Sequence, residues 1–206
     1  MIAIVDYGMG NLGSVCRALE ECGADVALAA DASGLERADR IVLPGVGAFC
    51  DGMLELKRRG FVDSLKRKVS EEKTPLLGIC LGMQLLASKG YEGGETFGLG
   101  FISGEVALMR PVDLALRIPH VGWNEVRHSG GCPILEGIPS GCDFYFVHSY
   151  CFAVRNAVNV AAVTPYGNDF VSIVQKENVY GTQFHPEKSS RAGFRLLRNF
   201  LGLRTA

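Results

Sequence analysis

The sequence has almost no net charge and no long apolar run, and each absence excludes a class of protein. Its 21 Lys and Arg residues are balanced by 22 Asp and Glu residues, so no strong positive field would attract a nucleic-acid backbone. No apolar run approaches the roughly 18 residues that a membrane-spanning helix needs. We therefore expect neither nucleic acid nor a membrane as a partner.

Cysteine and histidine patterns exclude further classes. The seven cysteines are an odd number, and the opening "MIAIVDYG" has no basic flank and turns polar within a few residues, unlike a signal peptide. Reduced thiols in a cytoplasmic protein are therefore expected. No C-x-x-C pair occurs, and the four histidines, at 120, 128, 148 and 185, show no ligand spacing on one helix, so no metal site is predicted.

Length and periodicity predict one α/β domain over residues 1–206. The chain is 48% hydrophobic, enough for one substantial core. Apolar runs at 2–5, 25–28, 40–43 and 75–79 alternate with helical patterns such as 12–21, which is typical of βαβ units and a parallel sheet. The helical pattern within 60–73 would bury one apolar face, with its Lys and Arg side chains in solvent; that face comprises Phe61, Val62, Leu65 and Val69.

In the second half of the chain, strand-like patterns replace the alternation of strands and helices. Strand-like runs separated by Gly, Pro and Asn favour antiparallel or mixed pairing, at 100–109, 122–127, 143–150, 158–164, 170–176 and 179–184. A final helix from about Ser190 would turn Phe194, Leu197 and Leu201 inward and its arginines, 191, 195 and 198, outward. The predicted fold is a central mixed, mostly parallel sheet flanked by helices.

The stretch "GMGNLG", 8–13, matches the glycine spacing of a dinucleotide-binding turn. Asp31 follows at about the distance expected of the ribose-binding carboxylate. However, Asp6 and Tyr7 separate the apolar run from the first glycine, whereas the dinucleotide turn follows its strand directly. Glycines also serve any tight connection, so NAD binding and an ordinary turn both stay open on this stretch alone.

The stretch "LLGICLGMQLL", 76–86, predicts a nucleophilic cysteine. Cys80 lies between Gly78 and Gly82 where an apolar run meets a helical pattern, which is the G-x-S-x-G elbow with cysteine in place of serine. The positive end of a helix favours a thiolate there, and the Leu81 N–H would point to the same place as an oxyanion donor. The alternative is a small buried thiol, which we expect of the other six cysteines.

A base for Cys80 is predicted in "GTQFHPEKSS", 181–190. Pro186 ends the preceding strand-like run, so His185 falls at a strand end, where α/β sheets place their sites. Glu187 can reach back to orient the imidazole and stabilise its charged form. Together the three side chains would make a nucleophile, base and orienter set.

With these residues in view, the sequence resembles a class I, or triad-type, glutamine amidotransferase domain. The resemblance covers the chain from end to end. Within the family, the sequence is similar to the glutaminase subunits of imidazole glycerol phosphate synthase in stretches 6–15, 43–49, 80–86, 119–124, 144–150 and 181–190. It assigns "GMGNLG" to the family's own N-terminal signature and implies that no cofactor, NAD included, is bound.

The resemblance implies a mechanism and a set of site residues. Cys80 would attack the side-chain amide of glutamine, His185 would move the protons, and a thioester would form and be hydrolysed. An oxyanion hole is implied between Leu81, which follows the nucleophile, and Gly45 and Val46, which lie in "PGVG" (44–47). Glutamine would be held by Gly47, Gln84, Glu92, Tyr145, His148 and Ser149.

The resemblance also implies a partner for the ammonia. A separate (β/α)8 barrel subunit would use it to make imidazole glycerol phosphate and an aminoimidazole carboxamide ribonucleotide in histidine biosynthesis, as a heterodimer with this chain. We expect Asn11, Trp123 and Lys188 to face that subunit.

Three other interpretations stay open on the sequence. The chain could supply ammonia to a different synthase, or it could be a cysteine peptidase or hydrolase on a similar sheet. It could also be a binding module in which Cys80 is inert. If a glutamine-mimicking electrophile failed to alkylate Cys80, the binding module with an inert Cys80 would be favoured.

Overall fold

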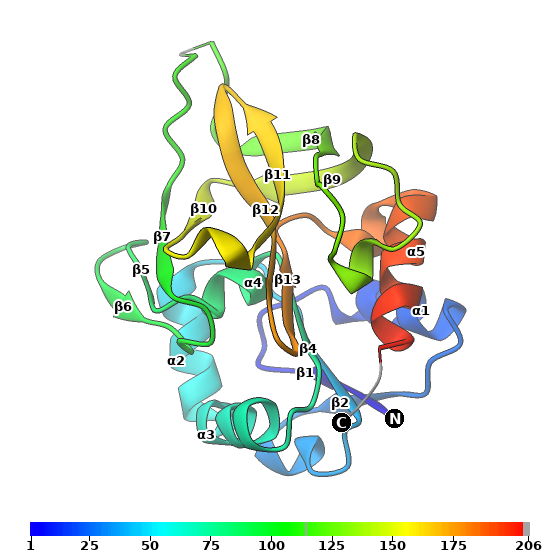
Figure 1. The fold of residues 1–206 in the computed structure, drawn as a ribbon. Helices are drawn as coiled ribbons and strands as arrows, with labels where there is room; N and C mark the ends of the chain where they lie inside the picture. The colour runs from blue at the N-terminus through cyan, green and yellow to red at the C-terminus, as the bar shows by residue number, and fades with distance from the viewer. Residues whose placement is uncertain (114, 204–206) are drawn as a thin grey trace.

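A seven-stranded sheet forms the centre of the molecule (Figure 1). The computed structural model describes residues 1–113 and 115–203. The strands of this sheet are, in spatial order, β11 (Val160–Tyr166), β12 (Asn168–Lys176), β13 (Val179–Thr182), β4 (Leu76–Ile79), β3 (Arg40–Leu43), β1 (Ile2–Val5) and β2 (Val26–Ala29).

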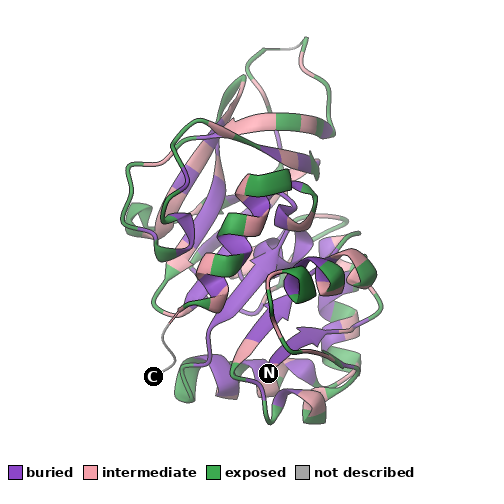
Figure 2. Ribbon diagram, turned by 90° about the vertical axis from the view of Figure 1, so that its right-hand side faces the viewer, coloured by how far each residue is buried: buried purple, intermediate pink, exposed green. Residues whose placement is uncertain are grey.

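The five strands from β13 to β2 are parallel, and β12 and β11 continue the sheet antiparallel. The mixed, mostly parallel sheet predicted from the sequence is therefore confirmed. Strands β1 and β4 are buried along their whole length, because helices cover both faces, and this explains why they read as uninterrupted apolar runs. Figure 2 shows this buried centre beneath a more exposed outer layer.

The helices divide between the two faces of the sheet. Helices α1 (Leu12–Glu21) and α5 (Ser190–Leu201) pack with Ile2 and Ile4 of β1. On the other face, α2 (Phe49–Arg58), α3 (Phe61–Lys66) and α4 (Leu81–Leu85) pack with Ala3 and Val5. The alternation along β1 thus sends successive side chains into two separate cores.

Two smaller sheets stand beside the main one. One contains β10 (Tyr150–Val154), β7 (Gly104–Leu108), β5 (Lys89–Gly90) and β6 (Thr96–Phe97), and the other pairs β8 (His120–Val126) with β9 (Cys142–His148). The sequence predicts the central mixed sheet but does not predict these two additional sheets. Strand β9 buries Phe144 and Phe146 while Val147 is exposed, so the β8–β9 ribbon packs onto the main core by one face only.

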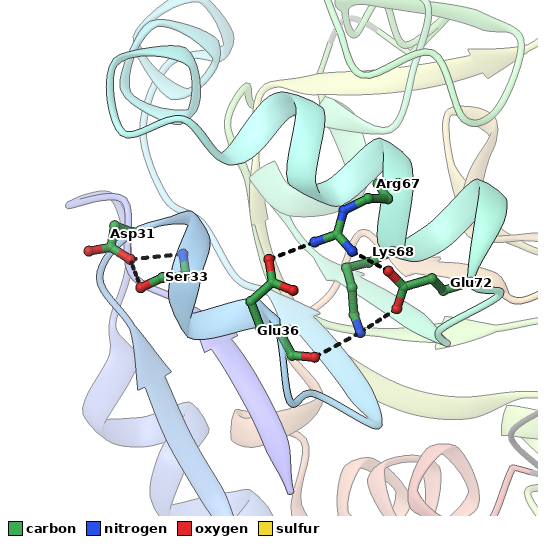
Figure 3. Close-up of polar contacts among 6 residues, drawn as sticks. All are labelled: Asp31, Ser33, Glu36, Arg67, Lys68 and Glu72. Carbon is green, nitrogen blue, oxygen red and sulfur yellow. Dashed lines mark hydrogen bonds and ion pairs between the residues drawn. The ribbon is translucent and has the colours of Figure 1, made fainter.

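Three details of the helices differ from the sequence expectation. After α3 the chain continues as a π-helix, Arg67–Glu71, which turns Lys68 inward. Figure 3 shows Lys68 bonded to the Glu36 carbonyl oxygen (3.2 Å) and to Glu72 (2.7 Å), so this lysine is not in solvent. In α5, Leu196 and Phe200 are buried with Leu197, whereas Phe194 and Leu201 are only half-buried.

Short 3-10 turns complete the fold, at Ala32–Leu35, Pro133–Leu135, Ala157–Asn159 and Pro186–Lys188. None of the helices in the described ranges has the length and apolar character required to cross a bilayer.

Candidate active site

Cys80 forms the whole turn between β4 and α4. Its backbone has φ 55° and ψ −109°, a conformation that L-residues rarely adopt and that marks functional turns. A Cβ on Gly78 would come within 2.6 Å of the Gly82 carbonyl oxygen, and a Cβ on Gly82 would collide with the Leu43 carbonyl oxygen. The two glycines therefore allow the sharp turn that the sequence predicts.

His185 reaches the same place from the neighbouring strand. Strand β13 pairs in parallel with β4, and the Cys80 N–H donates to the Thr182 carbonyl oxygen at 2.7 Å. Beyond β13, the His185 N–H donates to the Tyr145 carbonyl oxygen (3.0 Å), and the Ser189 hydroxyl donates to the His185 carbonyl oxygen (2.6 Å). These bonds fix the turn that carries the imidazole.

Glu187 sets the tautomer of His185. The His185 Nδ1 and a Glu187 carboxylate oxygen are 2.8 Å apart, and because a carboxylate only accepts, Nδ1 carries the proton. Nε2 is then the basic nitrogen. It is buried and forms no hydrogen bond of ordinary geometry with the described residues. The arrangement is that of a general base held by a carboxylate.

The electrostatics of His185 favour its charged form. Burial alone would disfavour the imidazolium, but the interaction with Cys80 and the hydrogen bond to Glu187 outweigh burial and raise the pKa of His185 to about 9.

The two predicted oxyanion donors, the Leu81 and Val46 N–H groups, are both engaged in backbone hydrogen bonds. The Leu81 N–H donates to the Gly45 carbonyl oxygen (3.3 Å), and the Val46 N–H donates to the Met9 carbonyl oxygen (3.3 Å). The Gly45 carbonyl and the Val46 N–H belong to the same peptide unit. In this conformation neither donor is free to bind an oxyanion.

A pocket of about 420 Å³ opens over Cys80. It is lined by Val46, Gly47, Ala48, Cys80, Leu81, Gln84, Glu92, Val147, His148, Ser149 and Tyr150. The structure therefore brings five of the six predicted glutamine-binding residues to the nucleophile. Tyr145 is not among the lining residues. Its ring lies against Trp123 instead, with the ring centres 6.1 Å apart.

Two glutamine side chains connect the pocket to the nucleophile. The Gln84 amide donates to the Tyr150 carbonyl oxygen and to the Gln183 side-chain oxygen, both at 3.0 Å. The Gln183 amide in turn donates to the Cys80 sulfur at 3.7 Å. Gln183 was not predicted, because in the sequence it reads as one more residue of a strand.

Glu92 links the pocket to the start of α2. Its carboxylate accepts a hydrogen bond from the Phe49 N–H at 2.8 Å, at the positive end of that helix. The Glu92 side chain therefore lies in the pocket, as the sequence predicts.

Comparison with known protein families agrees with this geometry. Residues 3–202 match the family described as glutamine amidotransferase class-I. The chain belongs to the class-I glutamine amidotransferases. It is also similar, over nearly its whole length, to curated proteins of one kind. It is 48% identical over 203 residues to imidazole glycerol phosphate synthase subunit HisH 1 of Campylobacter jejuni (strain RM1221), covering 98% of this chain and 100% of the relative. It is 47% identical over 199 residues to subunit HisH of Moorella thermoacetica, covering 97% and 93%.

Solved structures support the amidotransferase fold. A structure described as glutamine amidotransferase superposes with a TM-score of 0.76 at 21% identity, covering 98% of this chain and 97% of the other. PurLQS from Thermotoga maritima gives 0.76 at 18% identity, with coverage of 97% and 96%. At these identities the likeness concerns the fold alone.

The residues expected at a partner interface lie in two places. Trp123 is 54% exposed on β8, and Lys188 lies over the Tyr145 ring, 5.8 Å from its centre. Asn11 is exposed at the start of α1, where its side chain accepts from the Ser14 N–H (3.5 Å) and so caps the helix. This capping role is the alternative to an interface role for Asn11.

Two hydrogen-bonded histidines, His148 and His120, extend from the pocket of this amidotransferase, and the sequence did not predict their pairing. His148 Nδ1 donates to the Tyr150 carbonyl oxygen (2.9 Å), so its Nε2 must accept from His120 Nδ1 at 3.1 Å. Asn124 then lies 3.4 Å from His120 Nε2 as the donor that this tautomer needs. Burial lowers the pKa of both rings to about 4, so the pair is neutral at physiological pH.

Proposed function

We propose that the chain hydrolyses glutamine to glutamate and ammonia as the glutaminase subunit of an imidazole glycerol phosphate synthase, and that residues 1–206 form a single glutaminase domain. The observation that carries the proposal is Cys80, which lines the pocket on its strained turn, with the His185–Glu187 pair after the adjacent strand. The name and extent of the relatives support the choice of synthase.

In the proposed reaction the Cys80 sulfur attacks the side-chain carbonyl carbon of glutamine. A C–S bond forms, and the carbonyl electron pair moves to oxygen. His185 Nε2 carries the thiol proton to the amide nitrogen. The C–N bond then breaks, ammonia leaves, and Cys80 remains bound to the substrate as a thioester. His185 then takes a proton from water, whose oxygen attacks the thioester, and the sulfur leaves with glutamate as the product. Glu187 holds the ring throughout.

We assign glutamine binding to the lining of the pocket. The Glu92 carboxylate would bind the α-ammonium group, since it is an anionic group facing the cavity. Gln84 and the backbone near Gly47, His148 and Ser149 would hold the polar ends of the substrate. Tyr145 would act from the outer side, through Trp123 and Lys188, and not as a direct ligand.

The ammonia would pass to a second polypeptide, a (β/α)8 barrel that joins it to a nucleotide intermediate, in a cytoplasmic heterodimer. Exposed Trp123 and Val121 on β8 and Val147 on β9 support a docking surface. Val147 also lines the pocket, so a partner seated there would touch the active site.

The blocked oxyanion donors support activation by the partner. While the Gly45–Val46 peptide bonds to Leu81 and Met9, the tetrahedral intermediate lacks its two N–H donors. We therefore expect the isolated chain to be nearly silent as a glutaminase and to become active when the barrel subunit binds its nucleotide. Full glutaminase activity of the purified single chain would contradict this.

The test of the function is Cys80→Ala in the complex with the barrel subunit. The variant should lose glutamine-dependent synthesis by several orders of magnitude. Synthesis from free ammonia should persist, because the barrel does not need the thiol. Cys50→Ala, which changes a half-buried thiol on α2 away from the pocket lining, is the matched control. If Cys80→Ala retained a tenth of the glutamine-dependent rate, the nucleophile assignment would be wrong.

A further inference from the structure

Tyr7 places a hydroxyl group deep in the protein beside the oxyanion turn. The residue is 1% exposed, and its hydroxyl has no hydrogen-bond partner among the residues that the structure describes. It lies directly against Gly45, where an added Cβ would clash with the hydroxyl oxygen. Burying an unpaired hydroxyl is unfavourable, and a phenylalanine would fill the same space without that cost.

The surrounding backbone keeps Tyr7 where it is. The Arg59 guanidinium donates to the Asp6 carbonyl oxygen (2.9 Å), and the Gly8 N–H donates to the Asp6 side chain (3.1 Å). Both neighbours of Tyr7 are therefore tied down. Burial, and next to it the charge of Cys80, raises the pKa of Tyr7 well above its ordinary value, so the hydroxyl keeps its proton and stays a donor.

Opening the oxyanion hole creates a need for such a donor. Rotation of the Gly45–Val46 peptide would exchange its two ends, so that the Val46 N–H joins the freed Leu81 N–H beside the nucleophile. The Gly45 carbonyl would then turn toward the Met9 carbonyl, which now accepts the Val46 N–H. Two carbonyl oxygens that face each other repel, and each has then lost the N–H donor that it has in the closed state.

We propose that Tyr7 is a positioning residue that donates a hydrogen bond to the Gly45 carbonyl once the peptide has turned, and so stabilises the open oxyanion hole. The inference rests on the proposed glutaminase function. In the closed state the hydroxyl is left unpaired, which destabilises that state. In the open state it is paired. Tyr7 thus shifts the balance between the two states toward the active one.

The test compares Tyr7→Phe with the wild-type complex, barrel subunit and nucleotide included. Because the oxyanion donors act on the transition state, kcat for glutamine hydrolysis should fall about tenfold, while KM for glutamine stays within about twofold. Synthesis from free ammonia should not change. The melting temperature of the isolated variant should be equal to or above that of wild type, since only an unpaired hydroxyl is removed.

Tyr180→Phe is the matched control, because Tyr180 is also a buried tyrosine but packs against Phe200 in the core. It should leave kcat unchanged. An unchanged kcat in Tyr7→Phe would overturn the inference, and so would a lower melting temperature, which would mean that the hydroxyl is already paired. Loss of activity in Cys80→Ala alongside a fully active Tyr7→Phe would refute the role of Tyr7 alone. A wild-type complex with no glutaminase activity would refute the proposed function itself.

Discussion

At the scale of single residues, the site depends on a charge balance between Cys80 and His185. His185 is buried, and an isolated buried histidine would titrate below its ordinary value, as His148 does. Its interaction with Cys80 and its hydrogen bond to Glu187 reverse that tendency. The imidazole is therefore charged at neutral pH only while its neighbours are present.

We predict that Cys80→Ala lowers the pKa of His185 from about 9. The interaction with the sulfur raises this pKa, whereas burial, the largest single influence, lowers it and is unchanged. An NMR titration of the histidine ring would measure the shift, with Cys50→Ala as the control. An unchanged His185 titration in Cys80→Ala would mean that the two groups do not interact.

The same pKa sets a pH dependence of stability. Because the folded value is above the unfolded value of about 6.5, His185 stabilises the fold fully below pH 6.5. This contribution is lost as the pH rises through about 9.

We also predict that Gly82→Ala destabilises the fold. Its Cβ would collide with the Leu43 carbonyl oxygen, which belongs to the central sheet and cannot move aside. The free energy of unfolding should fall by about 2 kcal/mol or more. Gly13→Ala is the control, since a Cβ there meets nothing within 4 Å on α1, and alanine should stabilise that helix by about 0.5–1 kcal/mol. Urea unfolding of both variants checks the contrast, which equal stabilities would contradict.

The sequence predicts the residues that carry the chemistry better than those that support them. Cys80 lies between glycines and His185 precedes a proline, so local signals mark both. Gln183, Tyr7 and His120 have no such signal. Their importance depends on which strands become neighbours, and the pairing of β4 with β13 joins residues about a hundred positions apart in the chain.

At the scale of elements, strand and helix periodicity predicts the parallel half of the fold closely. Helix 12–21 and strands 2–5 and 40–43 agree with the structure residue for residue, and β2 is displaced by one. The division of the second half into three sheets was not predictable, because alternation along a strand gives its faces but not its partner. The π-helix at Lys68 was not predicted either. Arg67 and Lys68 bond to Glu36, which lies about 30 residues earlier in the chain, and the local sequence gives no sign of these contacts.

The β8–β9 ribbon should lose stability in acid. Burial holds the pKa of His120 and His148 at about 4, below the unfolded value of about 6.5. The unfolded state therefore takes up protons first, and stability that is complete above pH 6.5 is lost as the pH falls toward 4. His120→Gln, which cannot be protonated, should lose roughly 1–3 kcal/mol less than wild type between pH 7 and pH 4. Urea unfolding at both pH values measures this, and identical losses would show that His120 does not titrate on unfolding.

At the scale of the whole molecule, the exposed face of the β8–β9 ribbon is the candidate contact with the barrel subunit. Trp123 is the only tryptophan in the chain, and large exposed aromatics are typical interface anchors. Trp123→Ala should weaken assembly by about 1 kcal/mol or more without unfolding the free chain.

Phe97→Ala is the matched control for this surface, since Phe97 is also an exposed aromatic but belongs to β6, away from β8 (Figure 1). Calorimetric titration with the barrel subunit gives both affinities. Equal affinities for the two variants would place the partner elsewhere.

The pairing of β4 with β13 also bears on how such a protein can diverge. The nucleophile and the base follow adjacent strands of one ladder, so the spacing between them is set by backbone hydrogen bonds and not by the long chain that joins them. Insertions, deletions or new surface features can therefore accumulate in that chain, which carries β8 and Trp123, without moving one catalytic group relative to the other. Its contributions to the pocket constrain it, at Leu81, Gln84 and Glu92 and from Val147 to Tyr150. A lineage could thus exchange one synthase partner for another while its ammonia-producing chemistry stays fixed.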